Sequence, residues 1–457
     1  MLRRLTLLLG CCWLAAANAD DSQLRRLVTL SRHGSRAPNP VARALCPANA
    51  GNLDAYKVPA EQLTEVGMAQ LLAVGKHVQD EYMTRARFLS PSLNGVNHSH
   101  FETYFRADAA TRCSQSATAL ALGLYPDGTG PGGFGHQPVP VTMQLLQNEH
   151  AFAAPKGPCK AVLQKDLAVY AKKRAPELFA QYEAELKLMG EICGVEVEDY
   201  PTTPGGEDKV LGVKDVADMF VFDHDEQLPL TPGLTAELRA SVEQLAFTNL
   251  MERYYSTDRE ITYWVGGFAD LLLGNLNGAA TPVSPSIKDY RFYSYHGHRE
   301  LLHGLGKMLG WDFDFEGLPR AMGTTSLHPG TTMFFELRAR QSAEPSANEP
   351  TEEYFVRTFV WSPYTSREQI KLDKCSAIDC PLSEFNGIIR SHTAKTGTWE
   401  KICDYRPPTQ ELSQDDDGLD FSSGYILAAT VALSLVFAIY KAVGAIVKHR
   451  RRNYMPL

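Results

Sequence analysis

The sequence predicts an α/β fold in which a mostly parallel sheet is flanked by helices, interrupted by an inserted helical lobe and followed by one C-terminal transmembrane helix. Three observations support this prediction. Strand and helix patterns alternate between residues 27 and 145, which is typical of parallel sheets covered by helices. The block from 158 to 256 shows helical patterns almost throughout. Residues 421–440 contain no charged side chain, which suits a helix crossing about 30 Å of hydrocarbon.

The overall composition is that of a globular protein, and it excludes one class of partner. Of the 457 residues, 44% are hydrophobic and 21% are charged, which argues against wholesale disorder. The chain has 45 Lys and Arg against 53 Asp and Glu, a formal charge of −8. Without a basic excess or a stripe of basic and aromatic side chains, we expect no nucleic-acid partner.

The elements of the first half follow one another along the chain. Leu27 to Leu30 is an apolar run that ends at a polar turn, which indicates a buried strand. Leu63 to Met83 has apolar residues at helical spacing. Thr103 to Phe105 is then predicted as a strand, Thr111 to Leu124 as a helix and Val139 to Leu145 as a further strand.

The later strands are expected to complete the same sheet. Strand patterns return at Arg291 to Tyr295, Thr331 to Leu337 and Tyr354 to Trp361. The predicted division of the chain is, in order, a signal peptide at 1–19, an α/β core made of 20–157 and 257–403, a helical lobe at 158–256, a stalk at 404–420, a transmembrane helix at 421–447 and a cytoplasmic tail at 448–457.

Both ends of the chain predict export. Arg3 and Arg4 precede an apolar run that ends in small residues at 17–19, the layout of a secretory signal cleaved before Asp20. At the other end, the uncharged stretch is followed by the basic cluster 448–452, and such clusters belong on the cytoplasmic side of a span. We therefore expect a type I single-pass membrane protein whose body is luminal or extracellular.

The exported portion should be acidic, disulfide-bonded and glycosylated. Without the two signal arginines and the five cations of 441–457, the formal charge falls from −8 to −15. Of nine cysteines, two leave with the signal; most of the other seven should pair in an oxidising lumen, Cys375 and Cys380 are close enough in sequence to pair, and one must stay free. Asn97 opens a sequon and should carry a glycan. The Cys and His spacings do not fit a metal site, so we expect no metal and no cofactor.

One segment carries residues suited to phosphoryl transfer. Arg32 to Pro38 reads RHGSRAP and directly follows the first predicted strand, where ligands bind in α/β proteins. Arg32 and Arg36 offer planar forks of donors that match phosphate oxygens. An uncharged nitrogen of His33 beside them can attack phosphorus and form a covalent phosphohistidine. Gly34 lets the backbone approach closely.

This segment resembles the signature Arg-His-Gly-x-Arg-x-Pro of the histidine acid phosphatases, a branch of the phosphoglycerate mutase-like fold. With five fixed residues, a chance match has a probability on the order of 10⁻⁴ in a chain of this length. Other segments are similar in family order. They are Leu63 to Gly67, a helix start that Thr64 could cap; Arg106 to Arg112, whose last residue corresponds to a third phosphate-binding arginine; and Tyr293 to His296, the late strand.

The resemblance implies a set of site residues and also a departure from the family. Arg32, Arg36, Arg112 and His296 are expected to hold phosphate around His33. In the family, the late histidine is followed at once by Asp, or one residue later by Glu, and this acid protonates the leaving oxygen.

The usual acid is missing here. Gly297 and His298 follow His296, and an alignment that starts from His298 puts Arg299 directly after the histidine. We expect Glu300, four residues beyond His296, to substitute for the acid, with a solvated charge in the first helical turn as the alternative. Asp108 and His298 are the next candidates, and Gly297→Asp is expected to restore activity.

The expected function is that of a membrane-anchored acid phosphatase that hydrolyses phosphomonoesters, with turnover impaired by the missing acid. The alternative is a weak or inactive receptor or trafficking protein of the endolysosomal system. The last four residues, Tyr454 to Leu457, resemble the YxxΦ signal that clathrin adaptors read. We therefore expect a clathrin adaptor as partner and a location in endosomes or lysosomes, with the cell surface as a further location.

Overall fold

The computed structural model describes residues 21–94, 101–195, 200–202, 209–280, 290–311, 327–341, 352–363 and 365–406. The predicted signal peptide, Asn97, most of the stalk, the transmembrane segment and the tail with Tyr454 and Leu457 lie outside these residues. Within the described part of the chain, no helix is both long and apolar enough to cross a membrane. The chain up to Tyr405 forms one compact unit.

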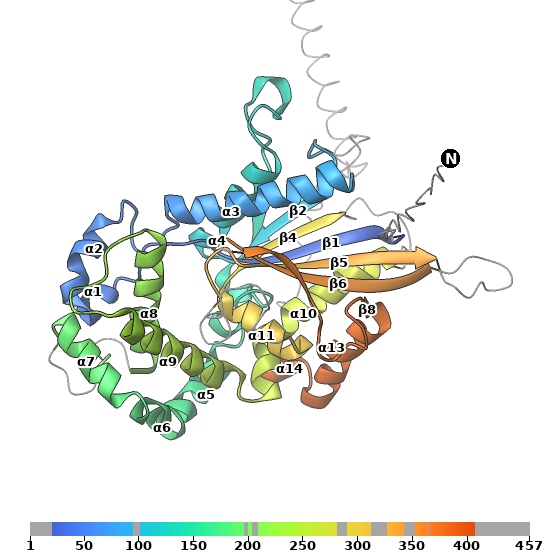
Figure 1. Cartoon of the computed structure of the whole chain (residues 1–457). Helices are drawn as coiled ribbons and strands as arrows, with labels where there is room; N and C mark the ends of the chain where they lie inside the picture. Colours follow the sequence, from blue (N-terminus) through green and yellow to red (C-terminus); the bar gives the residue numbers. More distant parts are fainter. Residues whose placement is uncertain are drawn as a thin grey trace, which may run out of the picture. The chain divides into compact units, whose positions relative to one another are not determined.

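A mixed sheet lies at the centre of this unit (Figure 1). Its strands are, in spatial order, β3 (Val141–Met143), β2 (Thr103–Ala107), β4 (Phe292–Gly297), β1 (Gln23–Arg32), β5 (Thr332–Gln341), β6 (Glu352–Ser362) and β7 (Thr365–Ile370), with β8 (Cys380–Pro381) paired to β6. The first four are parallel to one another, whereas β5, β6, β7 and β8 are antiparallel to their neighbours.

The prediction of a mostly parallel sheet is therefore right for only half of the sheet. Helices connect the parallel strands. Between β5 and β6 lie only residues 342–351, and between β6 and β7 only 363–364. Connections this short cannot make a parallel crossover, which needs a dozen or more residues, so the late strands pair antiparallel.

Helices cover both faces of the sheet. On one face lie α3 (Glu65–Val78), which continues into a π-helical segment at Gln79–Arg85, and α4 (Thr111–Leu124). On the other lie α10 (Asp258–Ala280), α11 (Arg299–Leu309), α13 (Leu382–Thr396) and α14 (Trp399–Ile402). Figure 1 shows α3 above the sheet and α10, α11 and α13 below it. Each face buries its own apolar core, with Leu71 and Leu120 on the first face and Val265 and Leu305 on the second.

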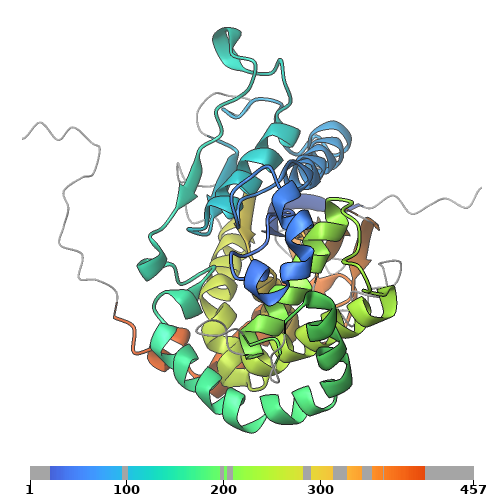
Figure 2. The same ribbon diagram turned by 90° about the vertical axis from the view of Figure 1, so that its left-hand side faces the viewer.

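A helical lobe with a separate apolar core extends from one end of the sheet, facing the viewer in Figure 2. It contains α1 (Ala42–Leu45), α2 (Ala50–Ala55), α5 (Lys160–Lys173), α6 (Ala175–Ala180), α7 (Glu183–Cys193), α8 (Lys209–Asp225) and α9 (Ala236–Tyr255). Short 3₁₀ turns complete the chain at Pro47–Asn49, Pro131–Gly133, Leu146–Asn148 and Ala154–Lys156. The helices α1 and α2 come from residues assigned to the core by sequence; they join the lobe because Cys46 pairs with Cys193 of α7 and Leu45 packs in the lobe's core.

The cysteines follow the expectation for an exported chain. Disulfides join Cys46 to Cys193, Cys159 to Cys403 and Cys375 to Cys380. Cys113 is free and buried. The prediction of mostly paired cysteines with one left over is therefore confirmed, as is the short-range pair.

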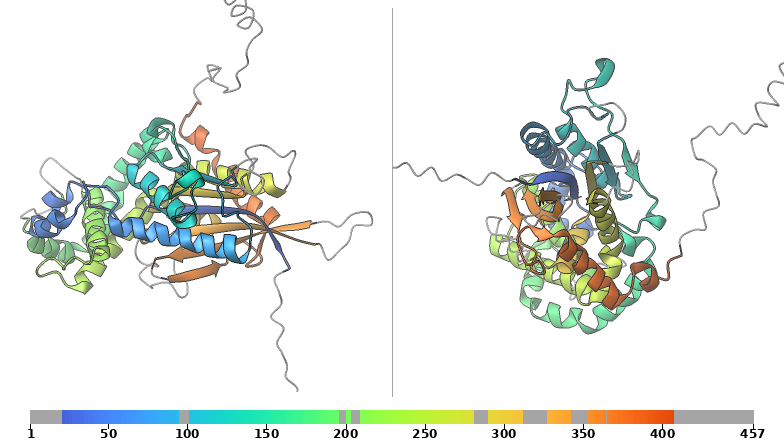
Figure 3. Two further views of the ribbon diagram at one scale, coloured as in Figure 1. Left: turned by 90° about the horizontal axis from the view of Figure 1, so that it is seen from above. Right: turned by 90° about the vertical axis from the view of Figure 1, so that its right-hand side faces the viewer.

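The strand register brings three chain segments to one edge of the sheet. Arg32 at the end of β1 is level with Gly297 of β4, and His296 of β4 is level with Ala107 at the end of β2. Residues that directly follow these strands therefore meet at the carboxyl edge, where ligands bind in α/β proteins. Seen from above, this edge of the sheet points towards the helical lobe (Figure 3, left).

Candidate active site

The loop after β1 is packed tightly against the start of α3. A Cβ atom added to Gly34 would lie 2.2 Å from the Gly67 carbonyl oxygen, and one added to Gly67 would lie 2.0 Å from the Ser35 carbonyl oxygen. Only glycine at both positions allows this approach. The Ser35 amide donates to Oε1 of Gln70 at 2.8 Å, and Thr64 caps α3 by accepting from the Gly67 amide at 3.1 Å. The loop backbone is thus fixed from both sides.

His33 has one ring nitrogen committed and the other available. His33 is only 5% exposed, and its Nδ1 atom is 2.8 Å from the Gly34 carbonyl oxygen. A carbonyl only accepts, so Nδ1 carries the proton, and the neutral imidazole keeps its lone pair on Nε2. Burial, followed by the positive charge of Arg112, lowers the pKa of His33 well below its usual value. The ring is therefore held in the form that can attack an electrophile.

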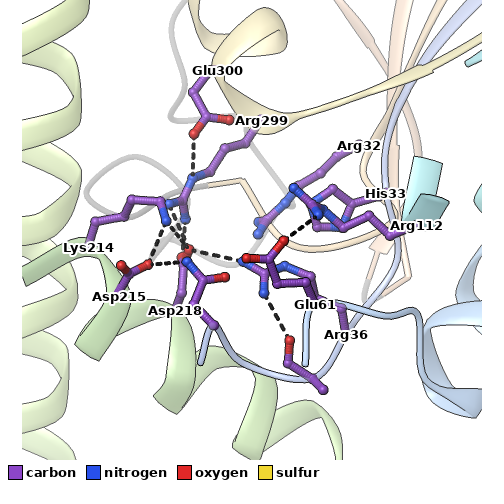
Figure 4. Close-up of polar contacts among 12 residues, drawn as sticks. Arg32, His33, Arg36, Glu61, Arg112, Lys214, Asp215, Asp218, Arg299 and Glu300 are labelled. Atoms are coloured by element: carbon purple, nitrogen blue, oxygen red, sulfur yellow. Dashed lines mark hydrogen bonds and ion pairs between the residues drawn. The ribbon is translucent and has the colours of Figure 1, made fainter. Parts of the chain in front are cut away.

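Three arginines surround this ring in Figure 4. Arg32 donates to the Leu327 carbonyl oxygen, Arg36 donates to the Ala37 carbonyl oxygen at 2.9 Å, and Nη1 of Arg112 lies 3.3 Å from Glu61. The Nε atom of each arginine is buried and has no hydrogen-bond partner in the described part of the chain. Unpaired buried donors are costly unless a ligand completes them, so the cluster is suited to an anion.

The guanidinium groups also disfavour one another's charge. Burial, together with the charge of Arg299, lowers the pKa of Arg32 to about 9, and burial lowers the pKa of Arg36 to about 10. A bound phosphate would relieve this repulsion. The structure therefore brings Arg32, His33, Arg36 and Arg112 together, as the motif predicts for the first three and the family resemblance implies for Arg112.

A second group of charges, from the lobe helix α8 and the start of α11, lies beside the arginines. Both terminal nitrogens of Arg299 donate to the buried Asp218 carboxylate, and Arg36 Nη2 approaches the same carboxylate at 3.9 Å. Lys214 Nζ lies 3.5 Å from Asp218 and 2.7 Å from Asp215. Burial opposes ionisation of Asp218, but the charges of Arg299 and Lys214 outweigh it and lower its pKa. Lys214, Asp215 and Asp218 gave no signal in the sequence because α8 carries no linear motif.

His296 does not join the cluster, and His298 does. His296 lies inside β4, stacks on Phe105 at 6.2 Å between ring centroids, and bonds the Ser294 hydroxyl at 2.9 Å through Nε2. Side chains alternate along a strand, and this register points His296 into the α3 and α4 face of the sheet. His298 follows the strand end, and its ring centroid is 5.3 Å from that of His33. The assignment of His296 to the phosphate site is therefore corrected to His298.

Asp108 holds the His298 ring in place. Oδ2 of Asp108 lies 2.5 Å from Nε2 of His298, and both residues are buried. Burial, followed by the charge of Lys156, lowers the pKa of His298 to about 4, against the opposing effect of Asp108. The neutral ring therefore carries its proton on Nε2, towards the carboxylate.

Glu300 lies at the margin of the cluster. It is the second residue of α11, and Figure 4 shows its carboxylate beside Arg299, with Oε1 3.8 Å from Nε. Burial disfavours the carboxylate, but the positive charge of Arg299 outweighs burial and lowers the pKa of Glu300 well below the usual range. With His298 as the late histidine, Glu300 stands at the place where the second family pattern has Glu. The expectation that neither alignment supplies an acid was wrong.

An acidic side chain introduced at position 297 would not point into the active site. A Cβ atom there would point at Phe152, 3.6 Å away, and at Leu301, 3.7 Å away. Both are core residues of the face opposite His296. Gly297→Asp would place a carboxylate among apolar side chains, which is unfavourable, so the expected gain of activity is withdrawn.

Residues 23–360 match the sequence profile of the histidine phosphatase superfamily, branch 2. The chain belongs to this superfamily. The match covers the parallel strands, β5, most of β6 and the inserted lobe, so the fold and the RHGSRAP loop are those of a histidine acid phosphatase, and the protein is a phosphatase acting on phosphomonoesters.

The chain is also similar to named relatives and, in fold, to solved structures. The chain is 24% identical to bovine (Bos taurus) lysophosphatidic acid phosphatase type 6 over 345 residues, covering 75% of this chain and 69% of the relative. It is 23% identical to the human (Homo sapiens) protein of the same name over 346 residues, with 75% and 69% covered. The Hafnia alvei phytase structure has a TM-score of 0.60 at 18% identity, covering 85% of this chain and 100% of that chain. The Citrobacter braakii phytase has a TM-score of 0.58 at 15% identity, covering 81% and 98%. At such identity, these phytase structures show similarity of fold alone.

Proposed function

We propose that the protein hydrolyses phosphomonoesters in two steps through a phosphohistidine on His33. The observation that carries this proposal is the Nε2 lone pair of His33, held by the Nδ1 contact to the Gly34 carbonyl within three arginines that have unpaired donors. The arginines bind the phosphate oxygens and stabilise the charge that spreads over them as phosphorus is transferred.

In the first step, Nε2 of His33 attacks phosphorus and the P–O bond to the leaving group breaks. Glu300, protonated, gives its proton to the leaving oxygen. In the second step, Glu300 takes a proton from water as the water attacks the phosphohistidine, which releases inorganic phosphate and restores His33. His298 gains a second proton when dianionic phosphate binds, because a nearby negative charge favours imidazolium, and it then donates to a phosphate oxygen. Asp108 keeps its ring in position.

The test of this proposal separates binding from turnover. His33→Ala should reduce the hydrolysis of an aryl phosphate by about 10³-fold or more, because the variant loses the nitrogen that would form the covalent intermediate. Vanadate should still bind, since the arginines remain. His136→Ala is the matched control, because His136 is an exposed histidine beside Asp127, and it should leave turnover unchanged. Full activity of His33→Ala would contradict the proposal.

The names of the relatives indicate which natural substrate to test first. Bovine and human lysophosphatidic acid phosphatases cover three quarters of this chain. We therefore propose a lysophosphatidate as substrate. Its kcat/KM should exceed that of glycerol 3-phosphate, which has the same phosphate ester but no acyl chain; equal values would exclude recognition of the lipid.

The predicted ends of the chain support a further proposal about topology. The signal at 1–19 would direct the chain into the secretory pathway before it is cleaved, and the span at 421–447 would anchor the phosphatase in a membrane with the active site on the luminal or extracellular side. Asn97 would then carry a glycan. Endoglycosidase should shift the mobility of the natural chain but not that of Asn97→Gln; an unshifted natural chain would argue against export or occupancy.

The tail supports a proposal about location. Tyr454 and Leu457 would be read by a clathrin adaptor and direct the protein to endosomes and lysosomes. Tyr454→Ala should move the steady-state population to the cell surface. An unchanged distribution by surface labelling would exclude the sorting role.

A further inference from the structure

Three potential metal ligands from separate parts of the chain lie together next to His33. Asp108 follows β2, Cys113 lies in the first turn of α4, and His298 precedes α11. Their ligand atoms all lie within 4.8 Å of one another. Nε2 of His298 is 3.8 Å from Sγ of Cys113 and 2.5 Å from Oδ2 of Asp108, and all three residues are buried.

We propose that Asp108, Cys113 and His298 form a binding site for a borderline-soft divalent cation such as Zn²⁺, and that occupation of this site inhibits the phosphatase. Thiolate, imidazole and carboxylate are the donors that Zn²⁺ takes from proteins, and three protein ligands leave a fourth position for water. The inhibition half of the proposal rests on the proposed function, whereas the binding half does not.

The distances are close to what such a site requires. Bonds of about 2.0 Å to nitrogen and oxygen and about 2.3 Å to sulfur place tetrahedral donors about 3.3–3.5 Å apart. The sulfur–nitrogen distance is 3.8 Å and the nitrogen–oxygen distance is 2.5 Å. For these two pairs, changes of about 1 Å or less are needed, and the sulfur–oxygen pair already lies within 4.8 Å; side-chain rotation can supply such changes. Sequence spacing gave no sign of this site because its ligands are far apart in the chain.

Binding changes the protons of two ligands and transfers no electrons. In the metal-free protein, the Cys113 thiol donates to the Gly297 carbonyl oxygen at 3.6 Å, and Nε2–H of His298 donates to Asp108. When the cation binds, the Cys113 thiol releases its proton to solvent. The His298 ring stays neutral: it loses the proton on Nε2 and carries one on Nδ1 instead. The thiolate, Nε2 and the Asp108 carboxylate then each supply a lone pair to the cation.

Inhibition follows from the loss of the bond between Asp108 and His298. A metal between them must separate their ligand atoms by most of an ångström, and the His298 ring is only 5.3 Å from the His33 ring. Displacements of about 1 Å in an active site cost on the order of 10²-fold in rate. The water that fills the fourth position of the cation would also occupy space beside the His33 ring.

The experiment uses the full chain and Zn²⁺ itself, with Cys113→Ser as the decisive variant. Serine keeps a hydroxyl that can donate to the Gly297 carbonyl but is a poor ligand for zinc. Without metal, Cys113→Ser should retain the natural turnover, because Cys113 takes no part in catalysis. The inhibitory Zn²⁺ concentration should rise at least about tenfold in this variant, and chelation should reverse the inhibition of the natural chain.

A second readout is independent of activity. Co²⁺ bound in place of Zn²⁺ should give a thiolate-to-cobalt charge-transfer band in the natural chain and none in Cys113→Ser. Glu384→Gln is the control variant, because Glu384 lies near the cysteines 375 and 380, which are closed in a disulfide, and it should change neither readout.

Three results would overturn the proposal. Equal Zn²⁺ inhibition of the natural chain and Cys113→Ser, or no cobalt band, would show that the cation binds elsewhere. A cobalt band together with undiminished turnover would contradict inhibition. If the chain proved to hydrolyse no phosphomonoester, the proposed function would fail, while the cobalt band would still decide whether the site binds metal.

Discussion

A nucleophilic histidine must stay uncharged at the pH at which it works, and burial provides this at His33. Its lowered pKa keeps the imidazole neutral at acidic pH, where an ordinary histidine, with a pKa of about 6.5, would be protonated. The acid limb of kcat/KM should therefore lie clearly below pH 6.5 for an aryl phosphate. A limb at the ordinary histidine value would contradict the buried, cation-surrounded environment of the ring.

The second residue-scale prediction concerns Glu300. Its lowered pKa keeps it ionised in the free enzyme, so the fraction able to donate a proton grows as the pH falls. Alkyl leaving groups need this proton, and aryl groups, which depart as stabilised anions, need it little. The alkyl-to-aryl ratio of kcat/KM should therefore rise from pH 7 to pH 4.

The variant Glu300→Gln tests the same role directly. It should reduce alkyl ester hydrolysis by about 10²- to 10⁴-fold, with a much smaller effect on aryl esters, and remove the pH dependence of the ratio. If both ester classes lose activity equally, Glu300 only supports the charge of Arg299.

These residues also show what a sequence can and cannot predict. Arg32, His33 and Arg36 lie in one short motif, so their proximity follows from local geometry. The choice between His296 and His298 depends on where β4 ends and which face it presents to α3, and neither is readable from the spacing of the histidines. Asp218 enters the site only through the packing of α8 on the core.

At the scale of elements, the close approach of the phosphate loop to α3 should be sensitive to one methyl group. Gly67→Ala would force its Cβ against the Ser35 carbonyl oxygen, and overpacking of this kind costs about 1–3 kcal/mol. Gly274→Ala in α10 has nothing within 4 Å and should stabilise the chain by about 0.5–1 kcal/mol. Denaturant unfolding of both variants measures the contrast; similar effects would argue against the tight loop.

The buried ion pair between Asp218 of α8 and Arg299 of α11 should contribute more to the free energy of unfolding than a surface ion pair does. Asp218→Asn leaves the buried Arg299 charge without its partner and should cost about 3–5 kcal/mol of unfolding free energy. Asp54→Asn removes an exposed pair with Arg43, whose side chains are 68% and 53% exposed, and should cost less than about 1 kcal/mol.

The same ion pair makes the stability of the folded chain depend on pH in a definite direction. The pKa of Asp218 is lowered in the folded chain, so its contribution is present above the ordinary pKa of Asp and is lost as the pH falls. Asp218→Asn should therefore lose stability less steeply on acidification than the natural chain. An identical acid dependence would show that the pair does not couple the lobe to the core.

Periodicity predicted most elements but not their full assembly. The helix at Thr111–Leu124 and the strands around residues 30, 105, 294 and 335 were found because their apolar patterns are strong. The strands β7 and β8 are short, and α1 and α2 are brief helices that depend on a disulfide and on packing in the lobe. Local patterns carry little information about such elements.

At the scale of the whole molecule, one disulfide closes a long part of the chain. Cys159 and Cys403 are 244 residues apart, whereas Cys375 and Cys380 are 5 apart. A longer closed loop restricts the unfolded chain more, so replacing both Cys159 and Cys403 by Ser should cost about 4–5 kcal/mol, more than the same change at 375 and 380. Thermal unfolding in matched conditions compares the two; the reverse order would contradict this account.

The carboxyl edge of the sheet and the start of α4 together place one nucleophile inside a shell of arginines, and the central claim is that His33 carries the phosphoryl group during turnover. The direct measurement is rapid mixing with an aryl phosphate, quenching in alkali, in which phosphohistidine survives, and mass spectrometry of the peptide that contains residues 27–36. We predict a stoichiometric phosphate on His33 that forms faster than steady-state turnover and is absent from His33→Ala. Full turnover with no phosphate on His33, or with phosphate on another residue, would contradict the account.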